Sequence, residues 1–185
     1  DAFAALLLAE QGDVDGVMEL APHLLDSPYR PWFQEGVGFA LTEAGRLEEA
    51  RALLDPLPPM VDCWLYLGVL TAATHSRVAL ADHEAVATLR DLLAPHAGLL
   101  GSMGTGVSFG DVDLALARAH HLLGDPDEAR RAVDRSVRTG EGNDGGPWLA
   151  RSLLFRAELT GSQADHARAA ALVAERGLPL VGQRL

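Results

Sequence analysis

The chain has 185 residues, of which 48% are hydrophobic and 22% charged, and this supplies enough apolar material for one continuous core. Its 26 acidic and 15 basic residues give a formal net charge of −11. Proteins that bind the phosphates of DNA or RNA need a concentrated basic face. The charge balance therefore argues against direct nucleic-acid binding.

The single cysteine, Cys63, excludes an internal disulfide. It lies in the apolar run Cys63–Leu67, where a buried, inert thiol is the favoured interpretation. The longest apolar stretches are shorter than the ~18 residues that a membrane span needs. A helical pattern begins at once, at Ala2–Leu8, without a signal peptide. We expect a cytoplasmic protein and a fragment of a longer chain.

Five successive segments show an apolar helix, a short turn and a second, amphipathic helix. Four of the turns contain a glycine, which suits the left-handed position after a helix: Gly12, Gly45, Gly124 and Gly161. The third turn, near Ala81–Asp82, has none. Gly12 and Gly45 are 33 residues apart and Gly124 and Gly161 are 37 apart. These spacings bracket the tetratricopeptide period of about 34 residues.

The pattern predicts an all-α fold, a tetratricopeptide-like right-handed superhelix of about five antiparallel helix pairs. We expect one domain over residues 1–185, with repeats at about 1–28, 29–60, 61–98, 107–140 and 146–180. Five residues after each turn glycine, a small residue is expected where the two helices of a pair touch. Ala50 and Ala129 fit this expectation, Val17 is tolerable and His166 fits poorly.

A flexible connection is expected between the third and fourth units. It is rich in glycine, and no run there alternates with a period of two, so no strand is predicted. The run Gly101–Ser108 imitates a phosphate-binding loop, but Val107 stands where the lysine is needed. We therefore expect no nucleotide site, with the alternative that this segment folds over a groove and contacts a ligand.

The fourth unit shows the helix signals most fully. Asp125 and Glu128 form a capping box around Pro126, which suits the first helical position. An apolar stripe follows at Ala129, Ala132, Val133 and Val137. Arginines cluster here too, but acidic residues are interleaved with them, which is typical of a solvated helix face; the arginines are Arg130, Arg131, Arg135 and Arg138.

Motifs for metal binding and catalysis are missing from the sequence. It contains no His-Glu-x-x-His, Cys-x-x-Cys or Gly-x-Ser-x-Gly. His120 and His121 are adjacent, so on a helix they point about 100° apart and cannot chelate one ion together. We expect no metal, no cofactor and no enzymatic activity.

The first helix of each pair lines the concave face of such a solenoid, a surface that suits an extended peptide, a helix or a neighbouring domain. Counting back from the turns predicts a partner-binding groove made by Trp32, Glu35, Phe39, Arg118, His121, Trp148, Arg151 and Phe155. The tryptophans could pack in the core or anchor a ligand. Arg118 and Arg151 could grip a carboxylate of the partner, or they could be solvated or pair with carboxylates such as Glu158.

Four segments carry a resemblance to a known family: Trp64–Leu70, Leu92–Gly98, Leu122–Ala129 and Pro147–Arg151. Through them, residues 64–178 resemble the C-terminal tetratricopeptide-like region of large bacterial ATP-dependent transcriptional regulators, of LuxR-type and related actinobacterial activators and of adenylate cyclase–ATPase relatives. The third unit departs from the family, because Ser76–Asp82 lacks its usual turn glycine–aspartate. Isoleucine and lysine, whose codons are AT-rich, are absent, and this indicates a GC-rich bacterial source.

The resemblance implies the regulatory end of a longer protein whose ATPase and DNA-binding domains lie outside this chain. We expect a protein-interaction domain that either controls such an ATPase within the same polypeptide or recruits a separate protein. The alternative is a small-molecule sensor whose groove closes around an effector. An unfinished end of the solenoid could also pair with a second copy, which makes a homodimer a further expectation.

Overall fold

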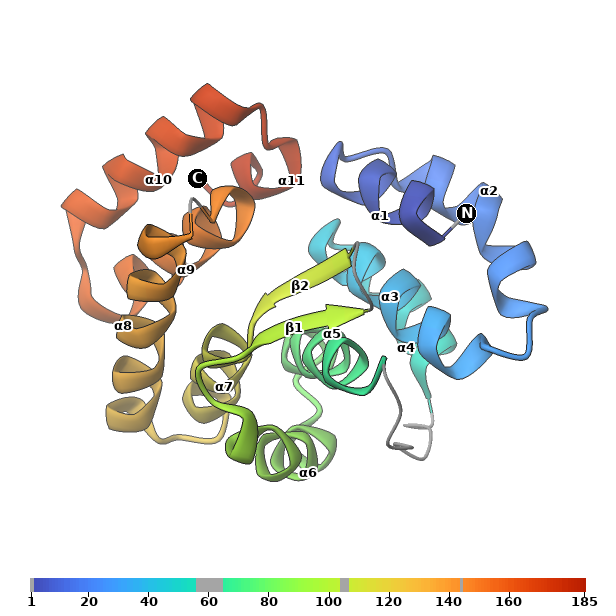
Figure 1. Ribbon diagram of the computed structural model, residues 1–185, viewed down its shortest axis with the longest axis horizontal. Helices are drawn as coiled ribbons and strands as arrows, with labels where there is room; N and C mark the ends of the chain where they lie inside the picture. The colour runs from blue at the N-terminus through green and yellow to red at the C-terminus, as the bar shows by residue number, and fades with distance from the viewer. Residues whose placement is uncertain (1, 56–64, 104–106, 144) are drawn as a thin grey trace.

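The computed structural model describes residues 2–55, 65–103, 107–143 and 145–185. Within these residues the chain forms antiparallel helix pairs that follow one another around a ring (Figure 1). The pairs are α1 (Ala2–Glu10) with α2 (Val14–Leu25), α3 (Arg30–Glu43) with α4 (Leu47–Leu54), α5 (Tyr66–Ala79) with α6 (His83–Leu93), α7 (Val112–Leu122) with α8 (Pro126–Gly142), and α9 (Gly146–Thr160) with α10 (Gln163–Arg176). The predicted all-α, tetratricopeptide-like solenoid of five helix pairs is confirmed.

The turns between paired helices lie where the sequence predicts them. Gly12, Gly45, Gly124 and Gly161 have φ values of 78°, 74°, 82° and 71°, in the left-handed region that glycine enters at little cost. In the third turn Ala81 takes this position, with φ of 55°. An alanine can replace glycine there, although the left-handed conformation costs about 1–2 kcal/mol.

The first helices of the pairs form an inner layer and the second helices an outer one. Residues 68–77 of α5 and 112–119 of α7 are all buried, because neighbouring helices cover these helices on more than one side. By contrast, α8 buries mainly one stripe, and it includes the predicted Ala129, Ala132, Val133 and Val137. The predicted cap is also present, since the Asp125 Oδ1 accepts a hydrogen bond from the Glu128 amide at 3.2 Å.

A two-stranded hairpin connects the third and fourth units, so the prediction of a flexible connection without strands was wrong. After the short 3₁₀ turn η1 (Ala94–His96), β1 (Leu100–Met103) pairs antiparallel with β2 (Val107–Asp111). The strands are short, a bulge opposite Gly101 interrupts their regular pairing, and the Phe109 side chain is fully buried. Packing against the helices, and not an alternating pattern, stabilises this hairpin.

Carboxylates anchor the hairpin at its open end, where β1 begins and β2 ends. Asp113 Oδ2 accepts a hydrogen bond from the Gly98 amide at 3.0 Å. Asp111 caps α7 by accepting from the Leu114 amide at 3.0 Å, and it also accepts from the Ser136 hydroxyl at 2.8 Å. Figure 1 shows β1 and β2 lying across the space that the helices surround. The hairpin thus occupies part of the concave face.

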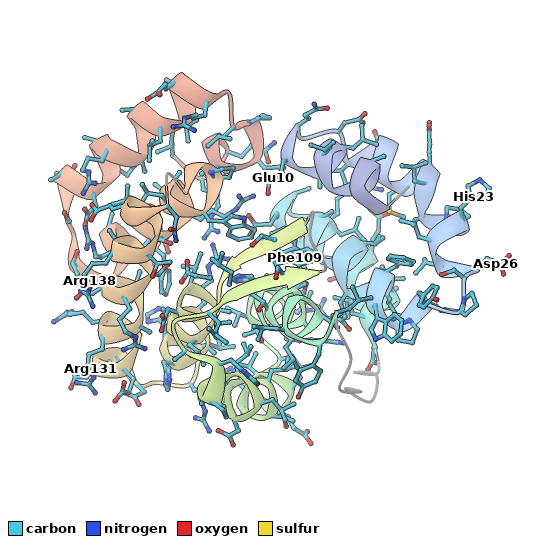
Figure 2. All side chains as sticks on the ribbon, viewed as in Figure 1. Glu10, His23, Asp26, Phe109, Arg131 and Arg138 are labelled. Atoms are coloured by element: carbon cyan, nitrogen blue, oxygen red, sulfur yellow. The ribbon has the colours of Figure 1, made fainter. Side chains whose placement is uncertain are left out.

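The two ends of the solenoid meet. The short helix α11 (Pro179–Gly182) contacts α1, and a Cβ added at Gly12 would lie 3.4 Å from the Pro179 Cγ (Figure 1). Figure 2 shows Phe109 inside the resulting ring, whereas Arg131 and Arg138 lie on its outer side, on α8. The helices thus surround a central region, across which the hairpin lies.

Several sequence predictions lie outside the described residues. They concern the buried thiol of Cys63, the role of Trp64, and Gly104 and Gly106 in the imitation phosphate loop. Among the helices that the structure describes, none is both long and apolar enough to cross a membrane.

Candidate functional site

The hairpin and a charged pocket occupy different parts of the central space. The hairpin contacts the N-terminal halves of the first helices: Phe109 lies 3.5 Å from a Cβ built at Gly36 of α3, and Gly101 packs on Thr71 of α5. The pocket lies at the C-terminal halves and has a volume of about 390 Å³. Its wall is formed by Thr42, Glu43, Gly45, His75, Val78, Ala79, Arg118, Phe155, Glu158 and Arg184.

Aromatic side chains fill the hairpin side of the central space. The Phe109 ring meets that of Phe39 edge-on, with centroids 5.4 Å apart. Phe39 lies beside Trp148 at 5.8 Å, and Trp148 stacks on His75 at 5.7 Å with an interplanar angle of 19°. Phe109 is fully buried, and so is Phe39 except for 1% of its surface. This packing closes one side of the concave face with the chain's own residues.

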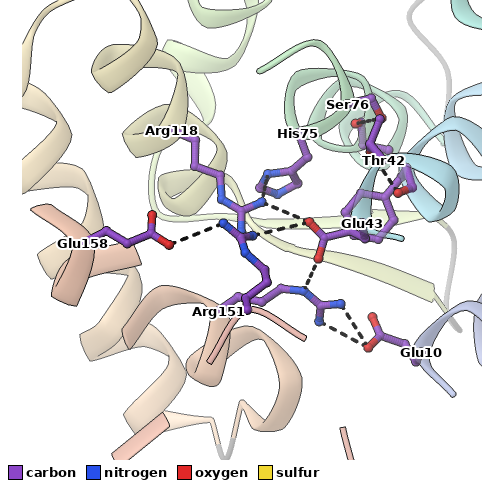
Figure 3. Close-up of polar contacts among 11 residues, drawn as sticks. Glu10, Thr42, Glu43, His75, Ser76, Arg118, Arg151 and Glu158 are labelled. Carbon is purple, nitrogen blue, oxygen red and sulfur yellow. Dashed lines mark hydrogen bonds and ion pairs between the residues drawn. The ribbon is translucent and has the colours of Figure 1, made fainter. Parts of the chain in front are cut away.

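Glu43 is the centre of the charged side (Figure 3). Its Oε2 accepts a hydrogen bond from Arg151 Nε at 2.9 Å, and its Oε1 lies 3.6 Å from Arg118 Nη1 and 3.7 Å from Arg184 Nη1. Burial acts to raise the pKa of Glu43, but the three guanidinium groups outweigh it and lower the pKa to about 2. Glu43 therefore stays ionised and lies on the pocket wall beside Arg118 and Arg184.

Arg151 is the most deeply buried member of this cluster, with no exposed side-chain surface. Its Nη1 and Nη2 both donate to Glu10 Oε2 at 3.2 Å, and its guanidinium carbon lies 4.6 Å from the centre of the Trp148 ring. Burial lowers its pKa, but Glu43 and Glu10 outweigh that effect and raise it. Arg151 thereby links α9 to α3 and to α1 and is fully paired.

Arg118 is less well paired. Its Nη1 lies 3.1 Å from His75 Nδ1, whereas its Nε and Nη2 are buried and have no hydrogen-bond partner in the described parts of the chain. Burial lowers the pKa of Arg118 to about 10, with Arg184 and Arg151 acting in the same direction. Burial and Arg118 also lower the pKa of His75 well below its usual value, so its Nδ1 is the acceptor of this contact.

The structure brings some of the predicted groove residues together and separates others. Arg118 and Phe155 line the pocket, and Arg151 lies beneath it. His121 is exposed and meets the Phe155 ring edge-on at 5.8 Å. Three others belong to the packing under the hairpin: Trp32 and Trp148, which are half-buried, and Phe39.

Glu35 lies away from the pocket and is fully buried. Its Oε1 lies 3.4 Å from Arg77 Nη2, which also donates to the Leu54 carbonyl, and its Oε2 has no partner among the described residues. Burial raises the pKa of Glu35 to about 7, although Arg77 opposes this. Glu35 therefore joins α3 to α5 and does not face the pocket.

Sequence reasoning missed four members of the charged cluster: Glu10, Glu43, His75 and Arg184. Both Thr42 and Glu43 line the pocket, but of these two neighbours counting back from Gly45 selects only Thr42 as facing the groove. The pairing of Glu43 with Arg151 spans 108 residues, and no local pattern reveals such a contact. No group of three or more His, Cys, Asp or Glu side chains that could hold a metal ion occurs within the described ranges.

Comparison with known proteins supports the repeat assignment. The family model for the tetratricopeptide repeat matches residues 31–56 and 111–135, which correspond to the α3–α4 and α7–α8 pairs. No curated protein and no solved structure is significantly similar to the chain. The chain thus contains a tetratricopeptide-like region, a kind of scaffold that generally mediates protein–protein interaction.

Proposed function

We propose that this chain is a protein-interaction domain of a bacterial signalling or transcriptional regulator and acts in the cytoplasm. The partner inserts a short segment into the pocket at the C-terminal ends of α3, α5, α7 and α9. The observation that carries the proposal is the composition of that pocket, since four first helices contribute its wall. This is the inner surface that helical repeats offer to ligands.

The hairpin limits what can bind. Because Phe109 and its neighbours fill the other side of the central space, a long extended peptide does not have the whole concave face available. A short segment or a chain end fits the remaining 390 Å³ better. The resemblance to ATP-dependent regulators favours a segment of the same polypeptide as this partner, and a separate protein is the second version of the proposal.

A peptide selection tests the proposal. Peptides selected on the whole chain by phage display are synthesised, and their affinity is measured by fluorescence polarisation. Ala79 is exposed on the pocket wall, so Ala79→Arg should block the pocket and weaken binding at least about tenfold. The matched control is Ala171→Arg, at an exposed position of α10, which should bind as the wild type does. Equal binding by the Ala79→Arg variant would refute the proposed site.

A second candidate function is that of a small-molecule sensor. The observation that favours it is the charged lining of the pocket, where Arg118 is 6% exposed and two of its nitrogens have no partner among the described residues. A ligand that binds only the folded state raises the melting temperature, so thermal shifts against a panel of metabolites test this function. A saturable shift of several degrees would favour the sensor, and a selected peptide without any metabolite effect would favour the interaction domain.

A further inference from the structure

Arg118 lines the pocket, and one hydrogen-bonding edge of its buried guanidinium group has no partner in the described parts of the chain. A guanidinium group binds carboxylates side-on through Nε and Nη2, which point in the same direction. In Arg118 these two atoms are the ones without a partner among the residues described, whereas Nη1 is occupied by His75. The edge that suits a carboxylate is therefore the edge that is free.

The same edge is filled elsewhere in this chain. Arg46 donates from Nε and Nη2 to Glu49 at 2.7 Å each. Arg156 donates from the same two atoms to Asp165 at 2.8 and 2.7 Å. Arg118 is more deeply buried than either, with a side-chain exposure of 6% against 30% and 21%. Unmade hydrogen bonds at this edge cost more free energy at a buried position, because water cannot replace the missing partner as well there.

The carboxylates nearest to Arg118 do not fill this edge. Glu43 approaches Arg118 only through Nη1, at 3.6 Å, and it is already held by Arg151. Glu158 lines the pocket, but its nearest cation is Arg184, at 3.6 Å. We infer that the pocket binds a carboxylate group of a ligand, side-on through Nε and Nη2 of Arg118.

The other lining residues define the rest of the ligand. Val78, Ala79 and Phe155 give the pocket an apolar part, which suits a hydrocarbon body next to the carboxylate. Glu43 and Glu158 line the same pocket, and they would repel a dianion such as a phosphate ester more strongly than a singly charged carboxylate. Arg184 is 34% exposed, and its guanidinium group lies 3.6–3.7 Å from the carboxylates of Glu43 and Glu158. A ligand can therefore displace the Arg184 side chain and reach Arg118.

Such a carboxylate has two sources, a small free acid or the C-terminal carboxylate of a peptide. The inference rests on the proposed function only in using the same pocket, because a free acid would bind Arg118 without any protein partner. The probes are therefore hexanoate, its neutral isostere hexanamide, and one leucine-terminated tetrapeptide in its free-acid and amidated forms. The readouts are calorimetry and the NMR signal of the Arg118 Nε–H, at matched ionic strength with the whole chain.

Hexanoate or the free-acid peptide should bind saturably and shift the Arg118 signal, and hexanamide and the amidated peptide should not. Arg118→Lys keeps the charge beside Glu43 but lacks the two parallel N–H donors of the guanidinium group, so it should weaken binding at least about tenfold. The control Arg168→Lys alters an arginine that pairs with Glu141 and does not line the pocket, and it should bind as the wild type does. Binding of hexanoate alone would identify a free acid as the source, and binding of the peptide alone a chain terminus.

Two results would overturn the inference. One is that neither carboxylate shifts the Arg118 signal saturably in the wild-type chain, a comparison that depends on no variant. The other is that the acid and the amide bind equally well. If carboxylates bind but Ala79→Arg leaves the selected peptides unaffected, the carboxylate site stands and the proposed partner site fails.

Discussion

Arg151 Nε donates a hydrogen bond to Glu43 Oε2 at 2.9 Å and so joins α9 to α3, across 108 residues of sequence. The same guanidinium donates to Glu10 of α1 at 3.2 Å (Figure 3). One buried arginine therefore ties together the first, second and fifth helix pairs. This contact, with that of α11 on α1, turns an open solenoid into a closed ring.

Arg151→Met should destabilise the protein strongly. It removes the closest cation from Glu43, whose side chain is 8% exposed, and the loss of one member of a buried ion pair typically costs about 3–5 kcal/mol. Urea unfolding followed by circular dichroism measures the change. The control is Arg168→Met, which breaks the half-exposed pair with Glu141 and should cost at most about 1 kcal/mol. Equal losses in the two variants would contradict the role of Arg151.

Glu35 should make stability depend on pH. Its pKa is raised from 4.5 to about 7 in the folded chain, so the folded state binds this proton more tightly than the unfolded state does. The resulting stabilisation is fully present below pH 4.5 and is lost as the pH rises to about 7. The difference in unfolding free energy between the wild type and Glu35→Gln should therefore fall by on the order of 3 kcal/mol over this range. A difference that stays constant with pH would refute the assignment.

Phe109→Ala should loosen the hairpin. The ring is fully buried against Phe39, and removing a buried phenylalanine side chain costs about 3–5 kcal/mol. Limited proteolysis should cut the variant between Leu99 and Asp111 faster than it cuts the wild type. Urea unfolding measures the change in the free energy of unfolding. Leu99→Ala is the control, because Leu99 is 51% exposed and contributes little. Unchanged proteolysis in the Phe109→Ala variant would show that this side chain does not hold the hairpin.

Gly110 should tolerate alanine less well than Gly124. Both have positive φ, 85° and 82°, so both variants pay about 1–2 kcal/mol for the left-handed conformation. A Cβ at Gly110 would lie 2.5 Å from the Trp148 ring, whereas at Gly124 it would meet nothing within 4 Å. Gly110→Ala should therefore lower the free energy of unfolding by about 1–3 kcal/mol more than Gly124→Ala does, because Trp148 must move. Equal thermal denaturation midpoints would contradict the close packing of β2 on α9.

The repeat architecture could be predicted from sequence because its signals are local. The turn glycines, the cap at Asp125 and the stripe from Ala129 to Val137 each depend on residues within a few positions of one another. The third turn could also be located without glycine, at Ala81. Turn, cap and core residues that lie close in sequence, together with the repeat spacing, were therefore enough to predict the helix pairs.

The hairpin and the charged cluster could not be predicted, because distant contacts decide them. Gly101 and Gly110 weaken the strand signal, yet both permit close packing of the hairpin on Thr71 and Trp148. The environment of Arg118 depends on Glu43, His75 and Arg184, each from a different part of the chain. Helix periodicity identified Arg118 and Arg151 as inward-facing, but it could not distinguish the fully paired Arg151 from Arg118, whose Nε and Nη2 have no partner within the described ranges.

Hydrogen exchange of the whole chain, measured with and without a selected peptide, shows which surface binds the partner. Binding should slow amide exchange at the C-terminal ends of α3, α5 and α9 and leave the outer helices α8 and α10 unchanged. The protected segments should be Thr42–Gly45, His75–Ala79 and Phe155–Glu158. Slower exchange confined to α8 and α10 would place the partner on the outer surface and rule out the pocket as its binding site.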